Sequence, residues 1–327
     1  MPPLIELREL TVELPTRDGW IRPVNNVSLK LERGASLGIV GESGSGKTML
    51  ALAMMGLLPP GARVSGEATL AGENSDSINL VTAKEERWTQ LRGRRVAMVF
   101  QEPMTALNPV MRIGAQIAEA ISEHDAAATG ENLQRRVIEA LELAAVPEPA
   151  ARARQYPHEL SGGLRQRVLI AMAIAAGDNK IPRVLIADEP TTALDVTVQK
   201  QILELLARLR RELGLALLFI THDLGVVAQV ADQIAVLYAG RVVEVGPALQ
   251  VLRAPKHPYT AGLLRASPQL TRKKLESIPG AVPSLDAMPP GCAFAPRCSL
   301  RIDECVATVP EMHAAGENQW ARCIRIE

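Results

Sequence analysis

The segment from Gly41 to Thr48 reads G-E-S-G-S-G-K-T and limits the folds open to this chain more than any other feature. It matches the pattern G-x-x-x-x-G-K-[ST] at every fixed position, and apolar runs flank it at 36–40 and 49–55. This order predicts a strand, a glycine-rich loop and a helix, so that backbone N–H groups turn toward a phosphate at a helix N-terminus. We therefore expect an α/β protein that binds a nucleoside triphosphate.

The side chains of this loop have distinct expected roles. Lys47 has the reach to contact the β- and γ-phosphates, and the Thr48 hydroxyl can ligate Mg²⁺. The other residues of the predicted phosphate cradle contribute through their backbone, and they are Gly41, Ser43, Gly44, Ser45 and Gly46. The alternative is a tight glycine turn that carries Lys-Thr by chance, and the flanking strand and helix patterns disfavour it.

Length, charge and hydropathy narrow the class of protein. A chain of 327 residues has room for one large domain and a smaller appendage. Lys and Arg together number 36, as do Asp and Glu, so the basic excess typical of nucleic-acid binding is missing. The longest apolar runs, 168–176 and 215–220, are too short to span a bilayer, and the N-terminus does not resemble a signal peptide. We expect a cytoplasmic protein that binds no nucleic acid and can dock on a membrane partner.

Strands are predicted from two kinds of pattern. Alternating apolar residues between 4 and 37 predict antiparallel strands joined by a polar loop. Short apolar segments predict further strands at 66–70, 95–100, 184–187 and 217–221. Because strands here alternate with helical segments, the core sheet is expected to be largely parallel.

Helical spacing dominates from about 103 to 176 and returns at 198–213, where Gly214 is placed to cap the helix end. Another helix is expected to open at 225–230. Beyond Pro255 prolines are frequent and periodicity fades. We therefore expect a nucleotide-binding domain at 1–255 and an irregular C-terminal extension at 256–327.

Two acidic residues, Asp188 and Glu189, end the predicted strand 184–187. A carboxylate at a strand tip can hold Mg²⁺, and the next one can polarise an attacking water. Such a pair alone is more typical of a helix N-cap. Its occurrence together with the phosphate loop favours the catalytic interpretation, with Asp188 as the Mg²⁺ ligand and Glu189 as the base.

Ser161, Gly162 and Gly163 lead directly into a predicted helix. A hydroxyl and free N–H groups at that position make a second anion site, although an ordinary Ser cap is the alternative. This segment lies between the phosphate loop and the acidic pair. In that order the chain resembles the ATP-binding cassette family, whose signature L-S-G-G-Q matches at four of five positions, with Leu164 replacing Gln.

The resemblance covers roughly residues 4–255 and implies roles for three more residues. Gln101 matches the glutamine that senses Mg²⁺ and the attacking water, and so counts among the Mg²⁺ ligands. Asp195, in T-A-L-D, matches the residue that contacts the opposite half of a dimer, and His222 matches the histidine that contacts the γ-phosphate. The implied fold is a P-loop NTPase with a parallel core sheet, an antiparallel β subdomain and a helical subdomain at about 103–176.

In this family the signature of one subunit closes over the ATP held by another. The chain carries one copy of each motif, so the resemblance implies a dimer with a second ATPase chain. The family usually stacks adenine on an aromatic side chain near the end of the first strand. That strand carries no aromatic residue here, and the nearest one is Trp20.

The segments 255–260, 263–268 and 278–283, together with 100–109 and 156–159, resemble the oligopeptide and dipeptide permease ATPases. The resemblance implies an ATPase subunit of a membrane importer for di- or oligopeptides, at the cytoplasmic face of the inner membrane. Its implied partners are a second and different ATPase subunit, two transmembrane permease subunits and an extracytoplasmic solute-binding protein. Nickel, glutathione and oligosaccharides are alternative solutes within the same branch.

All four cysteines lie in the last 36 residues, at Cys292, Cys298, Cys305 and Cys323. In a cytosolic protein such clustering favours metal binding over disulfides. No pair has the C-x₂-C spacing common in zinc sites, but thiolates at irregular spacing can still gather around an iron–sulfur cluster. The resemblance also implies a 4Fe–4S cluster. Zinc, free thiols or a disulfide are the alternatives.

Other functional classes explain less of the sequence. A soluble cassette ATPase acting on DNA or ribosomes would need coiled-coil insertions, tandem cassettes or a basic face, and the sequence shows none of them. An exporter would often carry membrane helices in the same chain. A phosphoryl-transfer kinase would leave Ser161 to Gly163 and His222 without a role.

Overall fold

The computed structural model describes residues 2–72, 77–177, 182–268, 270 and 275–326. The chain divides into two compact units. Met1–Glu32, Ser36–Ala83 and Phe219–Glu327 form the first unit, and Arg33–Ala35 and Lys84–Leu218 form the second. The division falls inside strand β8 (Ala216–Thr221).

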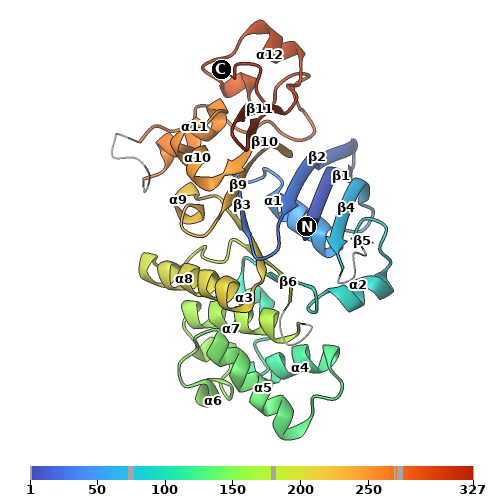
Figure 1. The fold of residues 1–327 in the computed structure, drawn as a ribbon, viewed down its shortest axis with the longest axis vertical. Coiled ribbons are helices and arrows are strands. Elements are labelled where there is room, and N and C mark those ends of the chain that lie inside the picture. Colours follow the sequence, from blue (N-terminus) through green and yellow to red (C-terminus); the bar gives the residue numbers. More distant parts are fainter. Residues whose placement is uncertain (1, 73–76, 178–181, 269, 271–274, 327) are drawn as a thin grey trace. The chain divides into compact units, whose positions relative to one another are not determined.

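An antiparallel sheet in the first unit has the strand order β2-β1-β4-β5 (Figure 1). Its strands are β1 (Ile5–Thr16), β2 (Gly19–Leu31), β4 (Arg63–Ala71) and β5 (Ser77–Asn79). Leu7 pairs with Leu29, and both are buried, so one face of the sheet is apolar, as the alternating pattern predicts. The expected antiparallel strands are therefore present, whereas β5 carries no pattern that predicted it.

A second set of strands in the first unit follows the order β11-β12-β10-β9-β3. Strand β3 (Ser36–Val40) is parallel to β9 (Gln233–Tyr238), and β9 is antiparallel to β10 (Arg241–Pro247). The end of the chain adds β12 (Gln319–Ala321) to β10 and β11 (His313–Gly316) to β12. The extension therefore continues the sheet instead of being wholly irregular, and β9 and β10 were not predicted.

The described helices of the first unit are mostly short. The phosphate loop is followed by α1 (Lys47–Met55), and the chain after β8 forms only one turn at α9 (Leu224–Val227), less than the expected 225–230. The extension contains α11 (Pro258–Ala266) and α12 (Asp303–Ala307), and α10 (Ala248–Arg253) precedes them. The prediction of irregular structure after Pro255 was therefore wrong for α11, a helix of nine residues.

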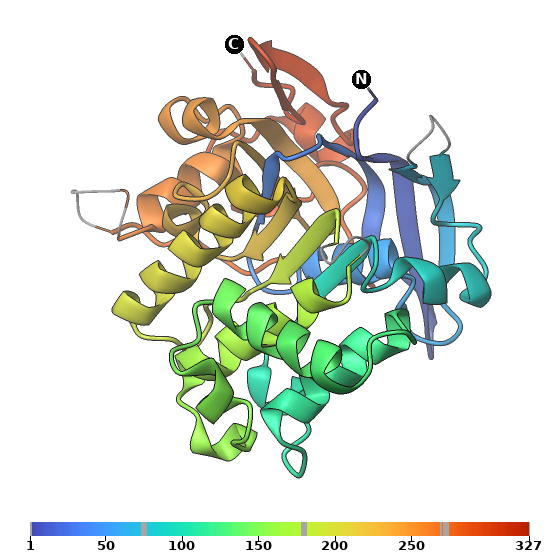
Figure 2. The same cartoon turned by 60° about the horizontal axis from the view of Figure 1, so that its bottom comes forward.

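The second unit pairs two buried parallel strands with helices. Strand β6 (Val96–Val99) pairs with β7 (Val184–Asp188), as the apolar segments predict. The helices that pack together are α4 (Ile113–His124), α5 (Gly130–Leu143) and α7 (Gly162–Ala175), drawn in green to yellow-green in Figure 2. Their contacts bury Ile117 and Leu141 completely.

Shorter helices complete this unit, and they are α2 (Glu85–Leu91), α3 (Pro103–Ala106), α6 (Pro149–Arg152) and the 3₁₀ turn η1 (Pro157–Glu159). Helix α8 (Val196–Leu213) ends as predicted at Gly214, which is left-handed (φ 67°) and donates its N–H to Arg210 O at 3.0 Å. Across the described parts of the chain, no helix combines the length and apolar character that crossing a membrane requires.

Candidate active site

Backbone geometry shapes the loop between β3 and α1 in the first unit. Gly44 and Gly46 adopt left-handed conformations (φ 78° and 101°) that other residues reach only with strain. A Cβ on Gly46 would lie 1.9 Å from Pro23 O, and one on Gly41 would lie 2.2 Å from Leu237 O. The glycines of the pattern are therefore required by close backbone packing, and they hold the loop at the start of α1.

Lys47 begins α1 and crosses back over the loop. Its side chain is buried, and Nζ donates to Gly41 O at 2.8 Å, to Glu42 O at 3.0 Å and to Ser45 Oγ at 3.4 Å. Thr48 is exposed at the first turn of the helix. A buried ammonium group and an exposed hydroxyl at a helix N-terminus suit an anion such as a phosphate together with a hard cation.

Two residues of the extension contact this loop, and the motif analysis did not foresee either. The Glu42 N–H donates to Tyr259 Oη at 2.8 Å, and the Glu42 carboxylate accepts hydrogen bonds from Arg297 at 2.6 and 3.0 Å. Glu42 and Arg297 are 255 positions apart. No local pattern in the sequence signals such a contact.

In the second unit, Glu189 follows the buried Asp188 at the end of β7. Its backbone is left-handed (φ 46°), a conformation that costs a non-glycine residue about 1–2 kcal/mol. Gln101 Nε2 lies 3.1 Å from its carboxylate, and Thr192 Oγ1 donates to it at 2.8 Å. The structure thus brings together the predicted base and the predicted glutamine. Backbone strain of this kind is typical of functional positions.

The signature segment opens α7. Ser161 Oγ accepts from Leu164 N–H at 3.4 Å as the helix N-cap, and Ser161 and Gly162 are both exposed. A Cβ on Gly163 would come within 2.5 Å of Val198 Cγ1, so this glycine permits close packing of α7 on α8. The ordinary capping role is therefore real, and it leaves Ser161 and Gly162 accessible to a ligand.

Asp195 and His222 lie at the ends of two elements. Asp195 caps α8, accepting from the Thr197 and Val198 N–H groups, each at 3.0 Å, and it is exposed. His222 follows β8 and is also exposed, and Asp223 beside it caps α9 with a hydrogen bond of 2.7 Å from Gly225 N–H. The proposed contacts of Asp195 and His222 with a partner and with phosphate stay predictions.

Trp20 already has a neighbour on its ring. The side chain is 41% exposed, and the Arg63 guanidinium lies 3.8 Å from the ring centroid. This cation–π contact covers one face of the indole. An adenine stacked on Trp20 would have to use the other face or displace Arg63.

The four cysteines were expected to form a metal or cluster site. Cys305 is buried, and Cys292 N–H donates to Cys305 O at 2.8 Å. Burial raises the pKa of the Cys292, Cys298 and Cys323 thiols, and the nearby Cys305 raises each further. Yet within the described ranges no three His, Cys, Asp or Glu side chains are arranged to hold a metal ion. The thiols are neighbours, but their arrangement gives no support to either a zinc ion or a cluster.

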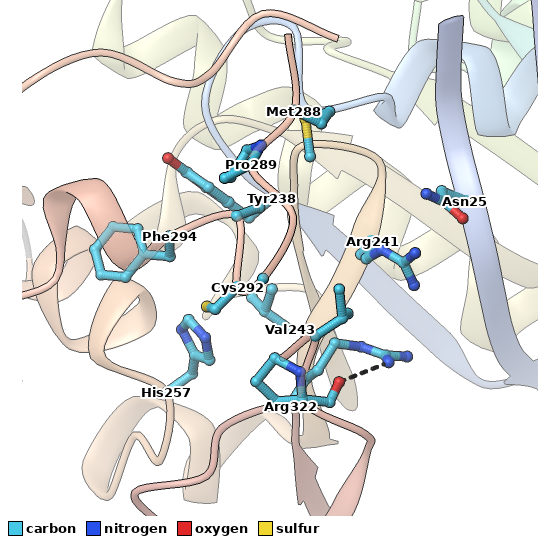
Figure 3. A pocket seen from close by; sticks show the side chains of 14 residues that line it. Asn25, Tyr238, Arg241, Val243, His257, Met288, Pro289, Cys292, Phe294 and Arg322 are labelled. Atoms are coloured by element: carbon cyan, nitrogen blue, oxygen red, sulfur yellow. Dashed lines mark hydrogen bonds between the residues drawn. The ribbon is translucent and has the colours of Figure 1, made fainter. Parts of the chain in front are cut away.

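A small cavity of about 90 Å³ adjoins Cys292 in the first unit (Figure 3). Cys292, His257, Tyr238 and Phe294 are among its lining residues. Burial lowers the pKa of His257 to about 3, and its Nδ1 accepts from Tyr259 N–H at 3.1 Å. His257 is therefore neutral near pH 7 and carries its proton on Nε2.

Fold and loop together define an α/β P-loop protein that binds nucleotide. A family model described as "ABC transporter" matches residues 24–192, and another, "Oligopeptide/dipeptide transporter, C-terminal region", matches residues 243–305. This chain belongs to the ABC transporter family. Its enzymatic class is that of an ATPase, and the resemblance in its motifs is confirmed.

Individual relatives agree with this assignment. A "Putative peptide import ATP-binding protein" of Brucella ovis is 46% identical over 333 residues, covering 99% of this chain and 97% of the relative. The "Oligopeptide transport ATP-binding protein OppD" of Mycobacterium tuberculosis is 46% identical over 330 residues, which are 100% of this chain and 52% of that relative.

Among solved structures, the dimeric ATP-binding cassette MJ0796 in a post-hydrolysis state with ADP and Pi is similar. It has a TM-score of 0.64 and 29% sequence identity, covering 75% of this chain and 98% of that one. The expected P-loop NTPase fold of the ABC type is therefore confirmed.

Proposed function

We propose that this chain is the ATP-hydrolysing subunit of a membrane importer for di- or oligopeptides. The observation that carries the proposal is the match of residues 243–305 to the C-terminal region of oligopeptide and dipeptide transporters. The printed names of relatives 46% identical over nearly the whole chain support it.

ATP binding is assigned to the loop between β3 and α1. The N–H groups around Gly44 and Gly46 and the Lys47 ammonium bind the β- and γ-phosphates. The Thr48 hydroxyl and the Asp188 carboxylate are hard oxygen donors of the kind that Mg²⁺ prefers, so the donor chemistry fits this ion. Bound Mg²⁺ neutralises charge on the phosphates.

Hydrolysis is assigned to Glu189 as the general base. Its carboxylate accepts the proton of the attacking water, while Gln101 orients that water and His222 contacts the γ-phosphate. The strained backbone of Glu189 and its hydrogen bonds to Gln101 and Thr192 support this assignment, because they fix the carboxylate in one orientation.

Transport requires partner chains. Exposed Ser161 and Gly162 close over the nucleotide of a second, different ATPase subunit, and Asp195 contacts that subunit. Two transmembrane permease subunits and an extracytoplasmic solute-binding protein complete the importer, which places this chain at the cytoplasmic face of the inner membrane. The chain itself then consists of a nucleotide-binding domain at 1–255 and an extension at 256–327.

Co-expression with the products of neighbouring genes tests this function. The expected result is co-purification with permease subunits and ATPase activity stimulated by di- or oligopeptides on their binding protein. Stimulation by nickel, glutathione or oligosaccharides instead would reassign the solute. If no membrane subunit co-purifies, the importer assignment is wrong.

For the extension, we propose that the four cysteines hold a 4Fe–4S cluster that pins this segment. The proposal rests on the chemistry of four soft thiol donors, and a backbone hydrogen bond places Cys292 next to Cys305, although the described side chains do not form a ligand set as they lie. Iron and acid-labile sulfide near four per chain, after anaerobic purification, are the expected result. Stoichiometric zinc without iron would mean that the cysteines hold zinc instead of a cluster. If neither metal is found, the cysteines are free thiols.

A further inference from the structure

Glu42, the second residue of the phosphate loop, is held from two directions by the C-terminal extension. Its N–H donates to Tyr259 Oη at 2.8 Å, and its carboxylate accepts a bidentate pair of hydrogen bonds from Arg297 at 2.6 and 3.0 Å. Paired, charge-assisted hydrogen bonds of this kind are the strong and directional ones. The contact therefore fixes both the backbone and the side chain of Glu42.

Arg297 cannot easily release this contact. Its side chain is only 3% exposed, and its remaining donors are also engaged, with Nε donating to Pro279 O at 2.9 Å and Nη1 to Tyr238 Oη at 3.3 Å. The Glu42 carboxylate raises the pKa of Arg297, so the guanidinium stays charged. Removing Glu42 would leave the buried guanidinium without its counterion, which is strongly unfavourable.

Tyr259 is equally fixed. It is fully buried on α11, and its ring packs 4.6 Å from Tyr238 on β9 and 5.4 Å from Phe294, measured between centroids. The three rings join β9, the neighbour of β3 in the sheet, to two parts of the extension, α11 and the segment around Phe294. The hydroxyl that receives the Glu42 N–H is therefore part of a rigid aromatic cluster.

Glu42 also contacts the phosphate-binding lysine through its carbonyl, because Glu42 O accepts from Lys47 Nζ at 3.0 Å. Tyr259 and Arg297 thus set the orientation of a residue whose carbonyl contacts Lys47. We propose that Arg297 is a positioning residue for nucleotide binding, so that the extension controls ATP affinity through Glu42. This inference rests on the proposed role of the loop in ATP binding and adds a regulatory input to it.

Thermodynamic linkage gives the inference a second consequence. If the extension favours the nucleotide-binding conformation of the loop, bound nucleotide must stabilise the extension by the same factor. Arg297 directly precedes Cys298, so any change that displaces the cysteine segment acts on the Arg297–Glu42 contact first. The extension then reports its own folded state to the ATP site.

The test measures binding of a fluorescent ATP analogue to the full-length chain and to single and double variants. Arg297→Met and Glu42→Gln should each raise the Kd about tenfold, a change equivalent to about 1.4 kcal/mol. Arg297→Lys keeps the charge but loses the bidentate geometry, so it should recover part of this loss. Arg253→Met changes an exposed arginine of α10 and serves as the matched control, with an unchanged Kd.

The double variant Arg297→Met/Glu42→Gln separates positioning from general support of the fold. If Arg297 acts through Glu42, the double variant binds no more weakly than either single variant. Hydrogen exchange should show faster exchange at 41–48 in Arg297→Met, and slower exchange at 292–298 on adding ATP to the wild type only. Additive losses in the double variant, or a Kd within twofold of wild type for Arg297→Met, would overturn the inference.

Two further variants keep the outcomes distinct. Tyr259→Phe removes only the hydroxyl and should weaken binding even if Arg297→Met folds poorly. Lys47→Ala should abolish nucleotide binding. If Lys47→Ala binds nucleotide as tightly as wild type, the proposed role of the loop in ATP binding is wrong. If Lys47→Ala loses binding while Arg297→Met and Tyr259→Phe bind normally, only the proposed control of ATP affinity by the extension is wrong.

Discussion

Two glycines of the phosphate loop allow steric and conformational costs to be measured separately. Gly44 and Gly46 are both left-handed, but a Cβ on Gly44 meets nothing within 4 Å, whereas one on Gly46 lies 1.9 Å from Pro23 O. For Gly44→Ala, left-handed strain costs about 1–2 kcal/mol, and the stiffer unfolded chain offsets about 0.4–1 kcal/mol of it. We therefore expect a net loss of about 1 kcal/mol in the free energy of unfolding.

Gly46→Ala adds the clash with a backbone oxygen, which cannot rotate away. Overpacking of this kind costs about 1–3 kcal/mol more, for a total of about 2–4 kcal/mol. Urea unfolding of the two variants, followed by circular dichroism, should give a clearly lower midpoint for Gly46→Ala, and nucleotide binding should be lost with it. Equal midpoints would refute the argument that Pro23 O dictates glycine at position 46.

Three further predictions concern the base, the helix packing and the buried histidine. Glu189→Gln should retain ATP binding but lower kcat about 100-fold or more, since general-base catalysis contributes about 10²–10⁴-fold; near-normal turnover would remove Glu189 as the base. Gly163→Ala should lower stability by about 1–2 kcal/mol because of Val198, and Val198→Ala in the same chain should restore that difference, as thermal unfolding can show. Burial lowers the pKa of His257 from about 6.5 in the unfolded chain to about 3 in the fold. Between these values the unfolded chain binds more protons, so this group lowers the free energy of unfolding by about 1.4 kcal/mol per pH unit as pH falls, and His257→Gln should remove that part of the slope.

The parts of the molecule that were predicted correctly share a local cause. The loop at 41–48 lies between a strand and a helix because its flanking apolar runs and its glycines act over a few residues. The same holds for β7, whose apolar run ends in Asp188, and for α8, whose end at Gly214 depends on one glycine in a left-handed conformation. Signals of this range are fully present in one sequence.

The features that were missed depend on contacts between distant segments. Strands β9 and β10 form where the chain returns to β3, and β11 and β12 have only four and three residues, too few to show a period. The left-handed backbone of Glu189 and the Arg63 contact on Trp20 likewise follow from neighbours that no motif names. Pairings of this kind join segments that are far apart in the sequence, so local sequence patterns do not show them.

The phosphate loop shows why this distinction matters for function. Its motif accounts for the glycines and for Lys47, whose Nζ donates to Gly41 O, but it leaves position 42 open to any residue. Arg297 of the extension explains the glutamate at that position, because it binds the carboxylate, whereas Tyr259 binds the backbone N–H. The motif therefore does not fix the identity of residue 42, but its contact with the extension does. We therefore expect that a chimera carrying the extension of a relative loses nucleotide binding unless residue 42 is exchanged together with the extension.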